Sequence, residues 1–224
     1  KNGVTAVTFS IEVEYALASA TYLTYRGQQP STYQIQADTQ QIVTESCTWL
    51  CRNALDPTTT RGTSTFRGDA VTFGTPTTVT ATGYSVFDSS NCVPFVISGT
   101  AEIAGPNYVN SFSIQLENNL RAQNAVGSLG AVGVGAGRVN ITGNLNTYFG
   151  DTSELTKLTS NTATAFAVGF EDASFNKGLI YDMPKIKYSG GQPDVTGIDT
   201  DIFLDLSFQA LRDLSNGRDY TLLI

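Results

Sequence analysis

The fold is decided by a stretch near the middle of the chain, residues 138–149, which reads RVNITGNLNTYF. Val139, Ile141, Leu145, Thr147 and Phe149 lie at alternate positions, and polar side chains fill most of the positions between them. Alternation of this kind is typical of a β-strand with one buried face and one wet face. Because strands with one wet face usually pair antiparallel, the stretch predicts an antiparallel sheet.

The same period of two recurs along the chain. It is clear in 7–15, 111–117, 166–170 and 201–208, and less regular in 43–49. Between 138–149 and 163–171, residues 151–154 (DTSE) predict a capping box, with Asp151 as the N-cap and Glu154 reaching back. Leu155 and Leu158 follow on one helical face. We therefore expect a mainly β protein, an antiparallel sandwich or barrel with one short helix at about 152–159 flanking the sheet and long loops between strands.

The composition restricts the classes of function. The chain has 224 residues, 15% of them charged, with 13 Lys and Arg against 20 Asp and Glu. Typical domains carry about 25% charge. A net charge of −7 argues against gripping a phosphate backbone, although not against passive contact with DNA. Histidine is absent, which excludes a triad of the usual type. We assign no catalytic, metal or cofactor-binding residue and expect a protein that is not an enzyme.

Three further features have structural interpretations. Cys47, Cys51 and Cys92 do not have the spacing of a zinc or redox site, and we interpret them as small buried hydrophobic residues. Lys185 and Lys187 are predicted to share a strand face with Tyr181 and Met183, too small a cluster for a nucleic-acid footprint. Exposed tyrosines could form a carbohydrate platform or a subunit seam. These tyrosines are Tyr22, Tyr25, Tyr33 and Tyr148.

Two long loops stand out. Residues 123–137, QNAVGSLGAVGVGAG, lack the GxGxxG and GK[ST] patterns of nucleotide loops, whereas glycines do allow two backbones to approach closely. Residues 189–201, SGGQPDVTGIDTD, are acidic. A calcium site built from Asp199 and Asp201 does not match EF-hand spacing, and a solvated loop is the preferred interpretation.

The region 107–213 resembles the tail tube proteins of long-tailed phages. The resemblance rests on 111–120, SFSIQLENNL, on 137–149, GRVNITGNLNTYF, with the short helix after it, and on later segments at 161–164, 183–187, 197–201 and 208–211. It implies a structural virion protein without chemistry. Such proteins form hexameric rings whose sheets join edge to edge, and the rings stack into a tube. The lumen holds the tape-measure protein during assembly and conducts DNA during ejection, and the helix packs outside the sheet.

The resemblance also implies partners and surfaces. The partners are the terminator and distal tail proteins, and assembly takes place in the host cytoplasm. Candidate acidic residues facing the lumen are Glu12 and Glu14 on one wet face, or Asp201 and Asp205 on another, and this choice is open. Candidate residues of inter-ring or inter-subunit loops are Gly130, Gly133, Gly135, Gly137, Gly190, Gly191, Asp194 and Asp199.

Several alternatives remain. The chain could be another ring protein of the tail, a terminator or distal ring, or a carbohydrate-binding β-sandwich module. An outer-membrane barrel would need banded aromatic residues, and a glycoside hydrolase would need two facing carboxylates. No segment is apolar enough for a membrane-spanning helix. We expect one tail-tube β domain over 1–224. Because Lys1 is not an initiator Met, we expect the protein to be either processed or the later part of a longer chain.

Overall fold

The computed structural model describes residues 7–63, 65–66, 69–70, 87–88, 97–103, 105–172, 177–195, 197–212 and 221–223. In this part of the chain, the strands are β1 (Phe9–Ala16), β2 (Ala20–Asp38), β3 (Thr44–Leu50), β4 (Asn53–Ala54), β5 (Thr65–Phe66), β6 (Asp69–Ala70), β7 (Ile97–Ser98), β8 (Ala101–Glu102), β9 (Val109–Glu117), β10 (Arg121–Gln123), β11 (Gly133–Gly135), β12 (Asn140–Tyr148), β13 (Thr164–Asp172), β14 (Lys177–Asp194), β15 (Phe203–Ala210) and β16 (Thr221–Leu223). The helix is α1 (Ser153–Thr159).

The predicted fold class is confirmed. Among the described residues, one twelve-stranded sheet runs β1-β2-β9-β12-β15-β14-β13-β7-β8, with β3 and β4 beside β2 and β16 beside β14. All the strand pairs recorded there are antiparallel. The sheet curls, so that β9 faces β13: the rings of Phe112 and Phe170 are 6.0 Å apart.

The hydrophobic core lies inside this curl. Strands β2, β9, β12, β13, β14 and β15 each turn alternate side chains inward, and the innermost are completely enclosed. Those with 0% or 1% exposure are Ile35, Leu145, Phe166, Val168, Phe170, Met183, Ile186, Leu204, Leu206 and Phe208. Burying such side chains contributes about 1.5–3 kcal/mol each, which makes this the main stabilising region.

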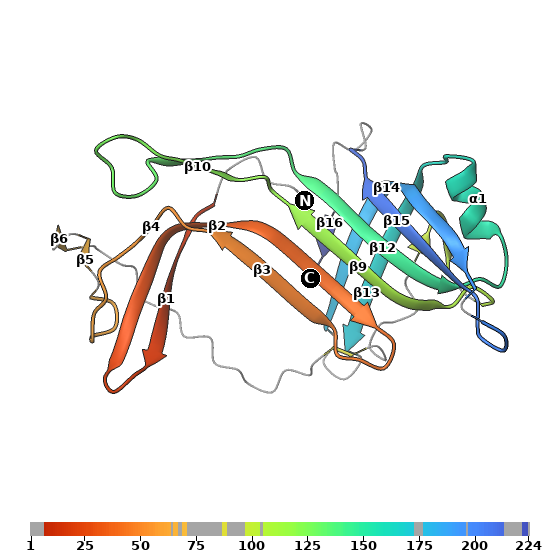
Figure 1. The fold of residues 1–224 in the computed structure, drawn as a ribbon, viewed down its shortest axis with the longest axis horizontal. Coiled ribbons are helices and arrows are strands. Elements are labelled where there is room, and N and C mark those ends of the chain that lie inside the picture. The colour runs from red at the N-terminus through yellow and green to blue at the C-terminus, as the bar shows by residue number, and fades with distance from the viewer. Residues whose placement is uncertain are drawn as a thin grey trace.

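A long arm projects from the core (Figure 1). Strand β2 is 19 residues long: its second half pairs with β3 and β9, whereas its first half pairs with β1 and β4. The sequence predicts a strand at 7–15 with one buried face. The strand is present, but the predicted burial is wrong at both of its ends. Phe9 and Tyr15 are 48% and 42% exposed, because β1 lies in the arm and not over the core.

Because β14 contains a bulge, two lysines do not lie where the sequence predicts them. Phe166 pairs with Met183 but Thr164 pairs with Ile186, so β14 carries one extra residue between them. Tyr181 and Met183 are buried before the bulge, and Ile186 and Tyr188 are buried after it. Lys185 and Lys187 consequently do not share the face of Tyr181 and Met183.

The helix begins differently from the predicted capping box. Thr152 is the N-cap and makes no side-chain capping bond. Asp151 instead accepts hydrogen bonds from the backbone N–H of Ser153 at 2.8 Å and from Asn107 at 2.6 Å. Hydrogen bonds from Ser153, and then from Asn107, lower the pKa of Asp151. The predicted capping box does not form, because the side chain of Glu154 points into the core rather than back toward the N-cap.

Glu154 is 4% exposed and fastens the helix to two strands. Its Oε2 accepts hydrogen bonds from the hydroxyls of Ser98 at 3.0 Å and Tyr188 at 2.9 Å, and its Oε1 pairs with Lys157. Burial, together with the charge of Glu154, raises the pKa of Tyr188. The helix thus closes one end of the core, next to β7 and β14.

We expect Glu154→Gln to lower the free energy of unfolding by about 1–3 kcal/mol, because Lys157 loses its charged partner in a buried network. Urea unfolding of both proteins measures the difference. Glu102→Gln, at an exposed position on β8, is the matched control and should change stability little. Equal stability of the two variants would contradict the buried network.

Candidate functional site: a polar sheet face

The convex side of the sheet carries a continuous polar surface. Its side chains belong to β2, β9, β12 and β15 and alternate with the core residues of the same strands. Cross-strand pairing arranges them in rows. We call the following set the polar face: Thr32, Gln34, Gln36, Asp38, Ser111, Ser113, Gln115, Glu117, Asn140, Thr142, Asn144, Asn146, Asp205, Ser207 and Gln209.

Hydrogen bonds between side chains hold this surface in place. Gln36 donates to Asp38 at 2.8 Å, and Gln115 donates to Glu117 at 2.8 Å. Between strands, Ser207 donates to Asn144 at 2.8 Å and Gln209 donates to Asn140 at 2.9 Å. Asn146 also donates to Asp205. Amide and hydroxyl groups fixed in this way present a regular, hydrated wall.

The charges on the polar face have one sign. Its ionisable side chains are Asp38, Glu117 and Asp205, and none of its members is Lys or Arg. At the β14 border of the polar face, Lys187 is paired with Gln209, and its amine donates to Asn161 at 3.1 Å. A surface of this composition lacks the clustered cations that hold a phosphate backbone.

The structure separates the four acidic candidates. Asp205 lies on the polar face, and Asp201 lies in the loop before β15. Glu12 and Glu14 lie on β1, in the arm. Glu12 accepts the backbone N–H of Gly62 at 2.9 Å and pairs with Arg61 at 3.6 Å.

The glycine and aspartate candidates lie in two different places, and several of them are in strands, so the long loop expected at 189–201 begins only after Asp194. Gly133 and Gly135 form β11, which pairs with β10 in a hairpin, and Gly130 and Gly137 flank that strand. Gly190 and Gly191 belong to β14 and pair with β15. Asp194 ends β14, and Asp199 lies in the following loop with a φ of 60°.

Three of the four strands that carry the polar face were predicted from the sequence, and the fourth was not. Residues 111–117, 138–149 and 201–208 were recognised as strands, but β2 was missed. Its alternation is visible in Tyr33, Ile35 and Ala37 against Gln34 and Gln36. Gly27 and Pro30 interrupt the pattern before it, and such residues usually argue against a continuous strand.

A second cluster lies beneath β3, on the inner side of the sheet. The hydroxyls of Tyr33 and Tyr181 hydrogen-bond to each other, and Tyr181 donates to Glu45 at 3.1 Å. Next to them is a cavity of about 250 Å³, lined mainly by apolar side chains and by Cys47. Burial is the main cause of a pKa of about 12 for Tyr33, and burial also raises the pKa of Tyr181.

The cysteine and tyrosine interpretations change accordingly. Cys47 is exposed and Cys51 is partly buried, so the expectation of burial is wrong for Cys47, while Cys92 lies outside the described residues. Tyr33 faces the interior, and Tyr148 packs on Phe203 with the ring centres 4.8 Å apart. The four tyrosines do not form one platform.

Comparison with known proteins identifies the family. The fold and surface define a mainly β, antiparallel protein with one short helix and a polar sheet face. The family model described as phage tail tube protein matches residues 2–210, and the chain belongs to that family. It is therefore a structural component of a phage tail, a virion protein that assembles with other tail proteins. A search of curated proteins found no match.

Two features are absent from the described residues. No group of three or more His, Cys, Asp or Glu side chains in that part of the chain could hold a metal ion. No helix within the same residues is long and apolar enough to cross a membrane.

We expect Tyr33 to ionise near pH 12, well above the ordinary value of 10. A raised pKa means that the neutral phenol is favoured in the folded state. The contribution of Tyr33 to stability is therefore complete below pH 10 and disappears as the pH rises through about 12. Ultraviolet titration of tyrosinate measures the ionisation, and unfolding at each pH measures the stability.

Tyr33→Phe should remove the late ionisation step and flatten this alkaline loss of stability. Tyr108→Phe, at a position that is 64% exposed, is the control and should leave the late step in place. A late step that persists in Tyr33→Phe would contradict the assignment.

Proposed function

We propose that this chain is the tube subunit of the tail and forms stacked hexameric rings, with the polar face lining the lumen that conducts DNA. The observation that carries the proposal is the polar face itself: four adjacent strands turn a continuous set of uncharged polar and acidic side chains to one side, with Tyr148 and Phe203 at one end of that side. The resemblance to the family supports the other parts of the proposal. These are the hexamers, the tape-measure protein in the lumen, the terminator and distal proteins at the tube ends, and assembly in the host cytoplasm.

The chemistry of the polar face suits the passage of DNA. Duplex DNA carries about one negative charge per 1.7 Å, so clustered Lys or Arg would hold it through the release of counterions. Carboxylates at Asp38, Glu117 and Asp205 repel phosphates instead. Amides and hydroxyls already bonded to one another keep a water layer against the wall. A lumen of this kind guides DNA without binding it.

Between the two acidic alternatives, the structure favours the face of Asp205. Glu12 is paired with Arg61, so the arm surface beside it carries a cation as well as an anion. The helix supports the same orientation. Its residues Leu155 and Leu158 pack against the core, on the side of the sheet opposite the polar face, as expected for a helix outside the tube.

Ring closure requires a strand edge with unpaired backbone groups. In the described part of the chain the outer edge of β3 supplies one, although Val43, just before β3, already donates its N–H to Phe87. The backbone N–H of Asn118 donates to the carbonyl of Ser31, which fixes the hydrogen-bonding pattern of β2. Successive residues of a strand direct their backbone groups to opposite sides. In this part of β2 the odd-numbered residues therefore bond to β9 and the even-numbered residues bond to β3. Glu45 and Cys47 on β3 then direct their N–H and C=O groups away from β2. Among the described residues, β3 pairs with β2 alone. It contains no Lys or Pro, the residues that usually protect an edge.

We expect Asn144→Lys with Ser207→Lys to slow DNA ejection at least several-fold while rings and tubes still form, because cations on the polar face bind phosphates. Receptor-triggered ejection from phage carrying the variant measures the rate. Glu14→Lys tests the other acidic alternative, and Glu102→Lys controls for net charge. Slowing by Glu14→Lys alone would move the lumen to the arm.

We expect Cys47→Pro to prevent ring formation, because proline removes an outward N–H without breaking a bond to β2. Cys47→Ala removes the thiol and keeps the N–H, so it should form rings normally. Negative-stain electron microscopy and sedimentation give the oligomeric state. Rings formed by Cys47→Pro would refute pairing along β3, and single rings that never stack in the unmodified protein would favour the terminator or distal-ring alternative.

A further inference from the structure

The hairpin formed by β10 and β11 exposes apolar side chains at its tip. Val126 and Leu129 are 108% and 76% exposed. The charged residues from 118 to 139 are Arg121 and Arg138, and no ion pair is recorded for either arginine within the described structure. We call residues 124–132 the hairpin tip. The hairpin tip is apolar, and the charged residues that precede and follow the hairpin strands are both cations, which suits a partner that is apolar and acidic.

The hairpin tip is held in a defined position. Ala131 donates its N–H to the carbonyl of Arg52 at 3.0 Å and accepts from Nε of Arg52 at 2.8 Å. A Cβ at Gly130 would lie 2.8 Å from Cβ of Asn53, so glycine permits this close approach. Because the tip is anchored before any contact is made, binding costs less conformational entropy.

The loop between β14 and β15 has the complementary character. Ile198 is 92% exposed and Val195 is 63% exposed. Asp194, Asp199 and Asp201 surround them, and no Lys or Arg occurs from 189 to 205. We call residues 197–202, together with Asp194, the acidic loop.

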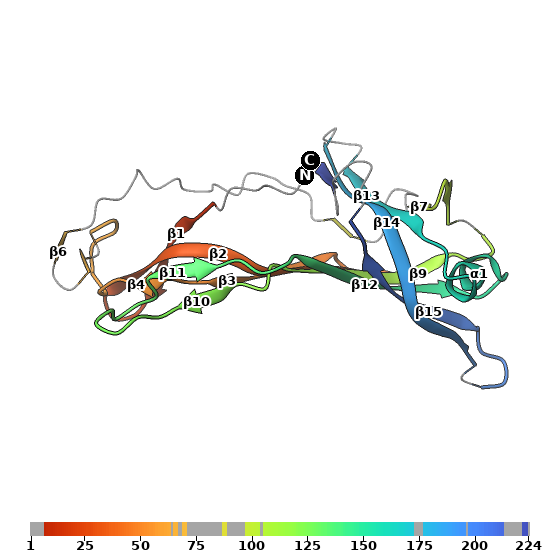
Figure 2. The same cartoon turned by 90° about the horizontal axis from the view of Figure 1, so that it is seen from above.

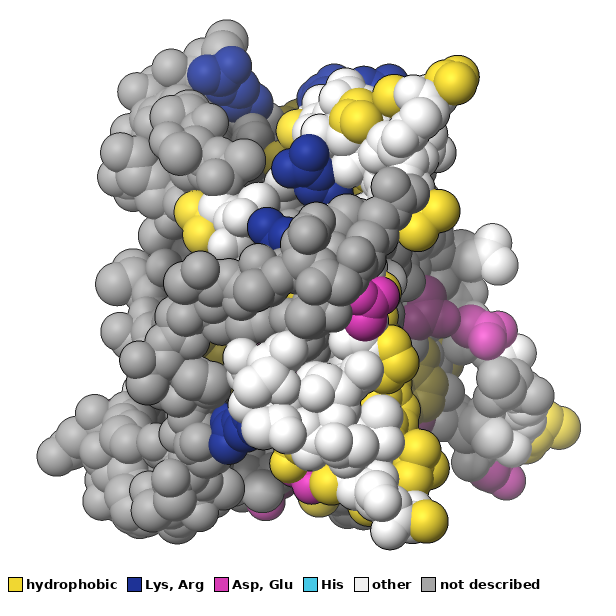
Figure 3. Space-filling model, turned by 90° about the vertical axis from the view of Figure 1, so that its left-hand side faces the viewer, with side chains coloured by type: hydrophobic (Ala, Val, Ile, Leu, Met, Phe, Trp, Pro, Cys, Tyr) yellow, Lys and Arg dark blue, Asp and Glu magenta, His cyan; other side chains and the backbone are white. Residues whose placement is uncertain are grey.

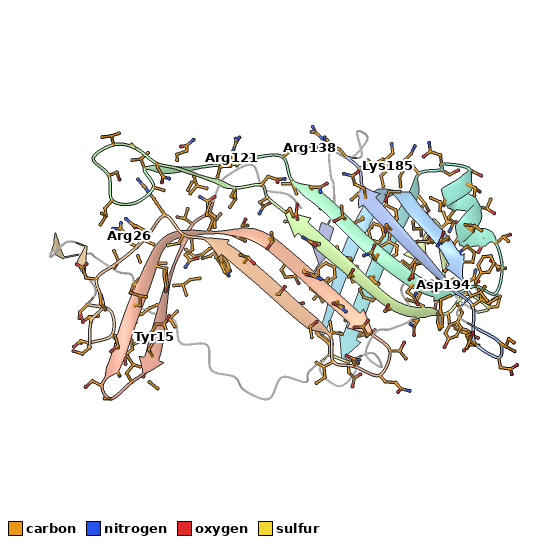
Figure 4. All side chains as sticks on the ribbon, in the orientation of Figure 1. Tyr15, Arg26, Arg121, Arg138, Lys185 and Asp194 are labelled. Carbon is orange, nitrogen blue, oxygen red and sulfur yellow. The ribbon has the colours of Figure 1, made fainter. Side chains whose placement is uncertain are left out.

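The hairpin tip and the acidic loop lie at opposite ends of the molecule (Figures 1 and 2). In Figure 4, Arg121 lies toward the hairpin end and Asp194 lies at the far end, beside the helix. Figure 3 looks at the hairpin end and shows hydrophobic side chains together with Lys and Arg side chains at its top. The two surfaces of one chain are too far apart to meet, so they can only meet between two copies.

We propose that the hairpin tip of one copy docks on the acidic loop of the next copy, which gives a directional, head-to-tail contact. This inference rests on the proposed tube function and names the surfaces that join successive subunits. Apolar side chains supply the buried centre, and the arginines and aspartates supply its rim. Tip against tip and loop against loop would each bring like charges together, so the opposite orientation is disfavoured.

A head-to-tail contact complements pairing along β3. It uses two different surfaces, so it can repeat without closing and extend an assembly indefinitely. The strand edge closes a ring, and the loop contact joins one ring to another. Salt should weaken this contact, because its charged rim is exposed.

Disulfide trapping tests the contact directly. In a chain with Cys47, Cys51 and Cys92 changed to Ser, one protein carries Leu129→Cys and an isotope-labelled partner carries Ile198→Cys. After mild oxidation at low salt, mass spectrometry should show the mixed disulfide dimer in at least tenfold excess over either homodimer. Leu17→Cys, at a position 67% exposed in the β1–β2 turn, is the control in place of Leu129→Cys and should give little mixed dimer.

An exchange of charges is the second test of the contact. Arg121→Glu with Arg138→Glu, added to the Leu129→Cys chain, should abolish trapping, and Asp194→Lys, Asp199→Lys and Asp201→Lys on the partner should restore it. Homodimers in excess, or no rescue by the exchange, would overturn the contact. Hexameric rings and tubes without trapping would overturn it and leave the tube function intact. Trapping by a chain that never forms rings or tubes would support the contact and refute the tube function.

Discussion

The register of β12 between β9 and β15 is the constraint on which the rest of the structure depends. In this register Leu145 faces the core while Asn144 and Asn146 face outward. A slip of one residue would exchange the two faces of the strand. Gly143 secures the register, because a Cβ there would lie 2.3 Å from Phe208 and 2.4 Å from the carbonyl of Ser113. The core and the polar face are therefore two consequences of one alignment.

The same sheet separates the proposed tasks of the protein. Its inner side supplies stability. In the proposed assembly its outer side supplies an anionic, hydrated wall, and the outer edge of β3 offers hydrogen bonds to another copy. The arm and the two long loops lie outside this arrangement and contribute little to the core. Such elements are free to make contacts between copies, because their side chains are not already committed to packing inside the subunit.

Prediction from the sequence succeeded where the alternation was uninterrupted. The strands at 111–117 and 201–208 and the helix near 152–159 were found because local periodicity and packing agree there. Strand β2 was missed because Gly27 and Pro30 break its pattern, and Lys185 was placed on the wrong face because a bulge cannot be read from spacing. The capping box at Asp151 failed because Glu154 found partners in Ser98 and Tyr188, which are distant in sequence.

The sequence by itself determined the class of fold, the acidic balance and the absence of histidine, because composition and a period of two are local properties. Only the tertiary structure decided which polar residues share one surface. Gln34, Gln115, Thr142 and Gln209 come from four strands and become neighbours through pairing across the sheet. It likewise decided that Asp205 and Glu12 lie on different parts of the molecule, because the position of a strand in the sheet depends on contacts between segments far apart in the chain.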